Sequence, residues 1–249
     1  VAGELRRVRA AHGNAAIFGG SYGWASAGRF HHAQSQVHRF LNSIGGYVRH
    51  VDSYSLGAAR VLLPHILATM EEVQVMHSSF PVLEAHTKLF VCFGGVPAKN
   101  AQISAGGAFQ HRVPSALRRM AGAGCRFVNI SPVRDDLDTG AAFEWIPIRP
   151  GTDTALMLAL GHVLLTEGLH DPEFLARCAT GFERFAPYLL GETDGQPKTP
   201  AWAAAITGVP AARITALARE MAGARTMISA GWSLQRAHHG EQPFWMALT

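Results

Sequence analysis

The sequence is short of cysteine, of clustered basic charge and of long apolar runs, and each shortage excludes a class of protein. Its three cysteines form no C-x-x-C pair, so no zinc or iron–sulfur centre is expected within these residues. No apolar run reaches the roughly 20 residues of a membrane-spanning helix, so we expect no membrane insertion. Lysine and arginine are dispersed without interleaved aromatics despite a net charge of +4, so no nucleic-acid partner is expected.

The residues that are present suit a globular chain. Hydrophobic residues make up 48% and charged residues 16%, which is enough apolar material to bury a core. Cys92 and Cys125 stand in or beside apolar runs and are expected to be buried thiols, and the lack of any disulfide pattern favours a reducing compartment. The chain begins at Val1 without an initiator methionine and stops inside a helical pattern, so we expect a fragment of a longer protein.

Alternating strand and helix patterns predict a parallel sheet with helices on both faces. Strands are predicted at 15–18, 88–93, 126–130, 144–148 and 226–230. Helices are predicted at 5–12, 30–41, 56–69, 114–123, 153–166, 172–179, 182–190 and 210–222, the third of them kinked or split by Pro64. Ligands of such sheets bind at the carboxyl ends of the strands. That rule selects the segments 19–24, 94–100, 131–136 and 231–236.

The first of these segments contains a hydrolase motif. Residues 19–23 (GGSYG) fit G-x-S-x-G, the nucleophile elbow in which Ser21 would attack a carbonyl. An elbow requires a helix directly after the turn, whereas residues 24–28 (WASAG) are a poor helix start, and no HGGG-type oxyanion segment is present. An α/β serine hydrolase using Ser21 is therefore kept as the alternative interpretation.

Two further segments offer anion-binding groups without a complete nucleotide motif. Residues 94–100 lack both G-x-G-x-x-G and G-x-x-x-x-G-K-[ST], and Lys99 is either a phosphate partner or a surface lysine. Gly151-Thr152-Asp153 opens a helix whose free amides favour an anion, and the Asp153 carboxylate can accept from a guanine edge. An ordinary helix cap explains these three residues equally well. A non-catalytic nucleotide-binding module is thus a second alternative.

A series of segments in a fixed order carries more information than any one motif. They are SYGWASAGRFH (21–31), YSLGAARVLLPH (54–65), GGVPAKNAQ (94–102), ISPVRDD (130–136), RPGTDTALM (149–157), YLLGETDG (188–195), AGWSLQR (230–236) and GEQ (240–242). Together they resemble the dimethyl sulfoxide reductase family of molybdenum enzymes, in the branch that holds biotin sulfoxide, dimethyl sulfoxide and trimethylamine N-oxide reductases. The resemblance runs over essentially the whole chain and implies that the chain is a minority of such an enzyme.

The resemblance also implies a metal ligand. In this branch a serine within D-Y-S-x-G-A-A binds molybdenum, and the motif stands here at residues 53–59, which makes Ser55 the ligand. Ser53 replaces the Asp of the family, although Asp52 is adjacent, so the neighbouring contact stays open. A hydroxyl suits this metal, because high-valent molybdenum favours oxygen donors and coordination removes the proton. The implied cofactor is molybdenum-bis(molybdopterin guanine dinucleotide).

Further residues receive roles from the same resemblance. Tyr22, Trp24 and Arg236 are implied to be catalytic, with Tyr22 donating a hydrogen bond to the substrate oxygen and Arg236 polarising the oxide. The implied cofactor contacts are Trp24, Lys99, Ser131, Pro132, Gly151, Thr152, Asp153, Trp232 and Gln235. Ser21 is then part of a pocket wall and not a nucleophile.

The expected protein is a molybdopterin-dependent S- or N-oxide reductase that performs two-electron oxygen-atom transfer. Its expected partners are a small-molecule oxide and an unidentified electron donor, and the 249 residues alone are expected to be inactive. The expected fold class is α/β, with residues 1–63 in a mixed α/β molybdopterin domain and residues 64–249 in a Rossmann-like three-layer domain that binds one molybdopterin guanine dinucleotide. We expect the protein in the cytoplasm, with the periplasm as the alternative.

Overall fold

A computed structural model describes residues 1–21, 30–53, 55–101 and 111–249. The chain forms two compact units. The first unit comprises Val1–Tyr54 and Lys99–His111, and the second comprises Ser55–Ala98 and Arg112–Thr249. The domain boundary that the sequence suggests near residue 63 stays a prediction about the whole protein.

The first unit contains two helices and a short parallel strand pair. Its elements are α1 (Ala2–His12), a 3-10 turn (Asn14–Ala16), β1 (Phe18–Gly19), α2 (Ala33–Ser43) and β2 (Val48–Arg49), with β1 parallel to β2. The strand predicted at 15–18 is mostly wrong, because the Ile17 N–H donates to the Asn14 carbonyl and closes a 3-10 turn there. The Asn14 side chain holds this turn by donating to the Gly46 carbonyl at 2.6 Å.

The second unit is built on a four-stranded parallel sheet. Its strands are β3 (Leu89–Phe93), β4 (Arg126–Ile130), β5 (Glu144–Ile146) and β6 (Thr226–Ala230), in the order β5-β4-β3-β6. Every neighbouring pair is parallel, and β3 lies in register with both β4 and β6. The predicted parallel α/β sheet is confirmed.

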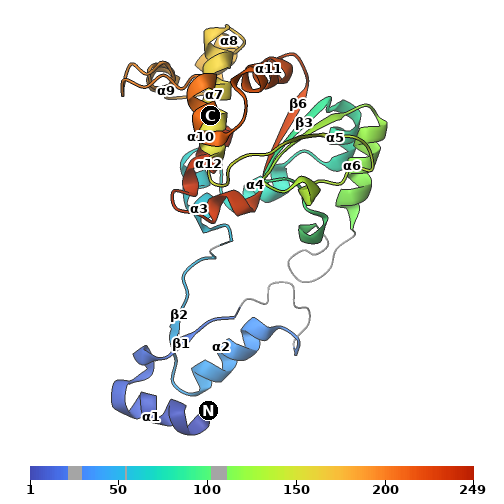
Figure 1. Cartoon of the computed structure of the whole chain (residues 1–249). Coiled ribbons are helices and arrows are strands. Elements are labelled where there is room, and N and C mark those ends of the chain that lie inside the picture. The colour runs from blue at the N-terminus through green and yellow to red at the C-terminus, as the bar shows by residue number, and fades with distance from the viewer. Residues whose placement is uncertain (22–29, 54, 102–110) are drawn as a thin grey trace. The chain divides into compact units, whose positions relative to one another are not determined.

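Side chains of the central strand alternate between two cores, as the pleat requires. Leu89, Val91 and Phe93 pack into one core, and Phe90 and Cys92 pack into the other. The first core lies under α7 (Asp153–Thr166), α10 (Pro200–Thr207) and α11 (Ala211–Ala222), and the second lies under α5 (Phe80–His86) and α6 (Arg112–Gly122). Figure 1 shows α5 and α6 on one side of the sheet and α7 and α11 on the other.

The predicted break at Pro64 is confirmed. Helix α3 (Gly57–Leu62) ends before it, a 3-10 turn (Leu63–His65) contains it, and α4 (Met70–Met76) starts afresh. Proline cannot continue the helix, because it lacks the N–H and its ring collides with the preceding turn. Thr69 and Glu72 then form a capping box that begins α4.

Three short helices were not predicted, namely α4, α5 and α10. The remaining helices, α8 (Pro172–Cys178), α9 (Phe182–Leu190) and α12 (Glu241–Leu248), lie where the sequence predicts helical segments. Within the described ranges, no single helix is long and apolar enough to cross a membrane, and only the bent pair α10–α11 reaches the required length and composition, with 117° between its halves.

Candidate functional site

Three loops meet at the carboxyl end of the sheet, where ligands of parallel sheets bind. The Gly94 N–H donates to the Ile130 carbonyl at 2.8 Å, which joins the turn after β3 to the end of β4. The Gly231 N–H donates to the Phe93 carbonyl at 2.7 Å and joins the turn after β6 to β3. The Val96 N–H donates to the Asp136 carbonyl at 2.7 Å. The loops after β3, β4 and β6 therefore form one continuous rim, which we call the carboxyl rim.

Glycine is required where these loops touch. Gly95 has a φ of +70°, and a Cβ added to it would lie 2.5 Å from the Asp136 carbonyl oxygen. A Cβ on Gly231 would lie 3.2 Å from the Phe93 carbonyl oxygen. The glycines that the sequence places at strand ends thus allow the backbones to approach each other.

The loop after β4 is stiffened by its own side chains. Asn129 is fully buried and its Nδ2 donates to the Arg134 carbonyl at 3.1 Å. The Ser131 hydroxyl donates to Asp136 Oδ2 at 3.2 Å and accepts from the Val133 N–H at 3.2 Å. Ser131 is 1% exposed, so its side chain shapes the loop, and the exposed Pro132 lies at the loop surface.

The start of α7 places Gly151, Thr152 and Asp153 together in the second unit. Gly151 has a φ of +77° and open space around its Cα, and Thr152 is the N-cap residue, although its hydroxyl donates to the Arg149 carbonyl instead of capping the helix. Asp153 is 4% exposed at the first helical position. Burial raises the pKa of its carboxyl group. No lysine or arginine of the described segments forms an ion pair with it in the second unit.

The segment after β6 connects the carboxyl rim to α3. Trp232 packs with Leu56 and Phe244 against a small apolar cluster whose buried members include Ala59. Gln235 is 6% exposed, and its Oε1 accepts from the Ala59 N–H at 3.0 Å. Its Nε2 is buried without a hydrogen-bond partner among the described residues. Arg236 is exposed beside it.

The structure places most, but not all, of the predicted site residues in one unit. Ser55, Ser131, Pro132, Gly151, Thr152, Asp153, Trp232, Gln235 and Arg236 belong to the second unit. Lys99 belongs to the first unit. Tyr22 and Trp24 lie outside the described residues. Ser21, the alternative nucleophile, is described and half-buried, but the segment that would have to form the elbow helix after it lies outside the described residues.

The donors and acceptors of the second unit suit a pterin nucleotide. A nucleotide with a phosphate bridge needs amide donors at a helix start, an acceptor for a base edge and a shaped polar rim. The start of α7, the buried Asp153 carboxyl group and the carboxyl rim correspond to these three, and Gln235 Nε2 adds one buried donor that has no partner among the described residues. Local sequence could not have linked Gln235 to Ala59, which is 176 residues away.

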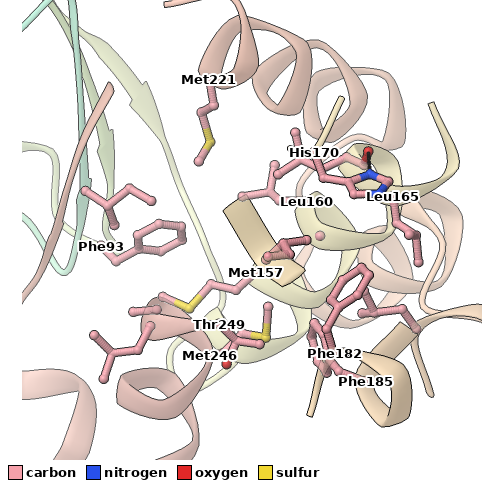
Figure 2. A pocket seen from close by; sticks show the side chains of 17 residues that line it. Phe93, Met157, Leu160, Leu165, His170, Phe182, Phe185, Met221, Met246 and Thr249 are labelled. Atoms are coloured by element: carbon pink, nitrogen blue, oxygen red, sulfur yellow. Dashed lines mark hydrogen bonds between the residues drawn. The ribbon is translucent and has the colours of Figure 1, made fainter. Parts of the chain in front are cut away.

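An apolar cavity in the same unit is a poor match for such a ligand. It has a volume of about 370 Å³ and lies among α7, α9, α11, α12 and the strands β3 and β6. Figure 2 shows Phe93, Met157, Phe182, Phe185 and Met246 around it. His170 and Thr249 are its only lining residues with a hydroxyl or ring nitrogen, and His170 Nδ1 already lies 3.4 Å from the Leu164 carbonyl oxygen.

A four-stranded parallel sheet with helices packed on both faces defines a protein of the α/β class. Acetylene hydratase from Pelobacter acetylenicus has a similar fold, with a TM-score of 0.60 at 20% identity over 99% of this chain and 30% of that chain. The sequence pattern of molybdopterin oxidoreductases matches residues 1–249. The chain belongs to the molybdopterin oxidoreductase family, as its motifs predict.

Curated relatives match the chain from end to end. Biotin sulfoxide reductase of Cereibacter sphaeroides is 50% identical over 248 residues, which is 100% of this chain and 33% of the relative. Dimethyl sulfoxide/trimethylamine N-oxide reductase of the same organism is 44% identical, over 100% of this chain and 30% of the relative. Trimethylamine-N-oxide reductase of Haemophilus influenzae is 40% identical, over 99% of this chain and 30% of the relative. The chain thus spans about a third of the length of these relatives.

Proposed function

We propose that the protein containing this chain is a molybdenum-dependent reductase of sulfoxides or amine N-oxides. The observation that carries the proposal is the end-to-end match, at 40–50% identity, to relatives named for those two substrate classes. We also propose a cytoplasmic location.

The proposed cofactor is molybdenum held by two molybdopterin guanine dinucleotides, of which one lies along the second unit's sheet. When bound, this group supplies a two-electron redox centre that accepts oxygen from the substrate. Ser55 provides the protein ligand to the metal. The proposed contacts of the dinucleotide and its pterin are Trp24, Lys99, Ser131, Pro132, Gly151, Thr152, Asp153, Trp232 and Gln235.

Asp153 illustrates how a contact of this kind would work. Its carboxyl group is buried and has no cation partner among the described residues, and burial raises its pKa because the ionised form is not compensated there. Guanine offers two parallel N–H donors, which a carboxylate accepts. Binding would therefore supply the missing partners and favour the ionised form.

Three residues are proposed to act on the substrate. Tyr22 would donate a hydrogen bond to the substrate or oxo oxygen, and Trp24 would either donate a hydrogen bond near the oxo group or pack on the cofactor. Arg236 is exposed beyond the carboxyl rim, and its fixed positive charge polarises the S–O or N–O bond. Charge that develops on oxygen in the transition state is then stabilised by fixed donors.

The test is elemental analysis of the full-length protein, made in a host that synthesises the cofactor. We expect about one molybdenum per protein and guanine nucleotide released by acid. Ser55→Ala should lower sulfoxide reduction by at least about 100-fold, because it removes a metal ligand. The matched control is Ser43→Ala, whose exposed hydroxyl only donates to the Phe40 carbonyl.

Two outcomes would contradict the proposal. Wild-type protein with neither molybdenum nor guanine nucleotide would remove its basis. Covalent labelling of Ser21 by a fluorophosphonate probe, with turnover of an ester, would favour the serine hydrolase instead.

A further inference from the structure

Helix α3 begins without a cap from its own neighbourhood. Its N-cap residue, Leu56, has no side-chain acceptor, and the first helical backbone bond is the one from the Arg60 N–H to the Leu56 carbonyl at 2.9 Å. The amides of the first turn therefore need acceptors from elsewhere. The amide of Ala59 is one of these. Ala59 is fully buried, so water cannot accept a hydrogen bond from its N–H.

The acceptor for the Ala59 N–H comes from Gln235, which is distant in the sequence but adjacent in the structure. Its Oε1 lies 3.0 Å from the Ala59 nitrogen, across 176 residues of sequence. The orientation of the carboxamide follows from this contact, because a backbone N–H can only donate and the oxygen must face it. The nitrogen Nε2 then faces away, buried and without a partner among the described residues.

The position of Gln235 is itself fixed by close backbone packing. A Cβ added to Gly240 would lie 2.0 Å from the Gln235 carbonyl oxygen and 2.7 Å from its Cα. Trp232 and Phe244 pack against the cluster that contains Ala59, on either side of Gln235 in the sequence. The carboxamide is therefore presented to α3 by a rigid support.

We propose that Gln235 is a positioning residue for Ser55: its side-chain oxygen caps the first turn of α3 at Ala59, four residues after that serine, and so fixes the backbone of the turn that follows it. The inference rests on the proposed function, because it takes Ser55 as the metal ligand. Gln235 Nε2 is the donor that remains for an oxygen or nitrogen acceptor of the bound cofactor. One carboxamide thus links the ligand-bearing turn to the cofactor.

The experiment compares Gln235→Met, Gln235→Glu and wild type in the full-length protein. Methionine keeps the length of the side chain but removes the acceptor, whereas glutamate keeps an oxygen for the Ala59 N–H. Gln196→Met is the matched control, since Gln196 is an exposed glutamine of the same unit. Each protein is prepared from a host without cofactor synthesis and from a host with it.

Two readouts are needed. In the cofactor-free protein, hydrogen exchange of the Ala59 amide should accelerate at least about tenfold in Gln235→Met and stay near wild type in Gln235→Glu and Gln196→Met. In the loaded protein, the molybdenum(V) paramagnetic resonance signal of Gln235→Met should shift toward that of Ser55→Ala, and Gln235→Glu should restore the wild-type signal in part.

Each alternative result has a distinct meaning. Unchanged Ala59 exchange in Gln235→Met would overturn the cap. Faster exchange with a wild-type resonance signal would overturn the positioning role, because the cap would then be structural only. If Gln235→Met does not fold, loss of Ala59 protection in Gln235→Glu overturns the proposal. Wild-type protein that binds no molybdenum would overturn the proposed function, before any variant of Gln235 is considered.

Discussion

Lys198 and Gln235 are both polar side chains buried in the second unit, and their surroundings differ in kind. Lys198 is 2% exposed, and its Nζ donates to Asp194 Oδ2 and to the Gln196 carbonyl and lies 4.2 Å from the centre of the Tyr188 ring. All these partners lie within ten residues of it. Gln235 finds one partner 176 residues away and leaves Nε2 without one in the described part of the chain.

The difference separates a side chain whose polar atoms are satisfied locally from one that keeps an unused donor, which we propose is completed by the cofactor. Lys198 Nζ has two hydrogen-bond acceptors and an aromatic ring within ten residues of it, so its charge is compensated locally and stabilises that part of the chain. A buried amide with one unused donor is costly unless a ligand or another segment completes it. Gln235, in the loop after β6, is such an amide, whereas Lys198, in the connection between α9 and α10, is satisfied by its own neighbourhood.

The largest expected effect in this comparison is at Lys198. Lys198→Met should lower the free energy of unfolding by roughly 2–3 kcal/mol, because it removes two hydrogen bonds of a buried ammonium group and its cation–π contact with Tyr188. Molybdenum content at a permissive temperature should stay at the wild-type level. Thermal unfolding and elemental analysis of the full-length protein measure both. If Lys198→Met lost molybdenum without losing stability, Lys198 would serve the cofactor and would not be a purely structural residue in contrast to Gln235.

A slightly smaller effect is expected at Gly240. Gly240→Ala forces a Cβ into the Gln235 backbone and should cost about 1–3 kcal/mol of stability, as overpacking does. It should also accelerate hydrogen exchange at Ala59, because it displaces the carboxamide that caps α3. Gly122→Ala is the control, since a Cβ there meets no atom within 4 Å. Equal stability and equal exchange in the two variants would mean that Gly240 does not support Gln235.

Asp153 is, like Gln235, a buried polar group that we propose is completed by the cofactor. Its effect on the free energy of unfolding should depend on pH. Its folded pKa is raised by burial, so the stability tied to its protonated form is present below the unfolded pKa and is lost as pH rises through the folded pKa. Asp153→Asn should therefore be more stable than wild type at neutral pH in the cofactor-free protein, with the advantage vanishing in acid.

Loading the cofactor should reverse that order. Asparagine cannot accept two parallel N–H bonds from guanine, so Asp153→Asn should retain less nucleotide than wild type. Unfolding scans between pH 3 and pH 8, in about six steps around the ordinary aspartate pKa, measure the first effect. A variant with wild-type pH dependence would show that Asp153 is not the group responsible.

The smallest effect is expected at Cys92 and Cys125, two buried thiols that need no hydrogen-bond partner. Burial raises the pKa of the Cys125 thiol to about 11 and raises that of Cys92 as well, so neither forms a thiolate at neutral pH. Cys178 is exposed. An alkylating reagent at pH 8, about the ordinary thiol pKa, should modify Cys178 in native protein and all three thiols after unfolding, with no change in molybdenum content. Modification of Cys92 in native protein would indicate that the sheet opens.

The sequence predicts those helices and strands that have a clear hydrophobic pattern and residues that mark where they begin and end. Strands 126–130 and 226–230 and helix 153–166 lie where the patterns place them, because apolar runs end there at turns or caps. Helix α10 was missed, because the run PAWAAAIT is apolar on most sides and has no helical period, although Thr199 caps it and Gly208 ends it. Short helices α4 and α5 were missed within a polar stretch.

The site was predictable in its composition but not in its contacts. Ser131 is in a segment that the family motif marks, yet its hydroxyl is used inside its own loop. The bond between Gln235 and Ala59 joins residues that share no local pattern, so it emerges only when β6 returns to the sheet. Local sequence patterns predict where a turn occurs, whereas the pairing of distant strands determines which side chains come into contact.

The order of the sheet has a consequence for synthesis of the chain. Strand β3 pairs with β6, so this edge of β3 stays unpaired until the residues of β6, which begins at Thr226, have been synthesised. At roughly 5–20 residues per second, this interval lasts on the order of ten seconds. During it, the uncharged run LFVCF has one open strand edge. We expect this segment of the nascent protein to be the one that a chaperone shields.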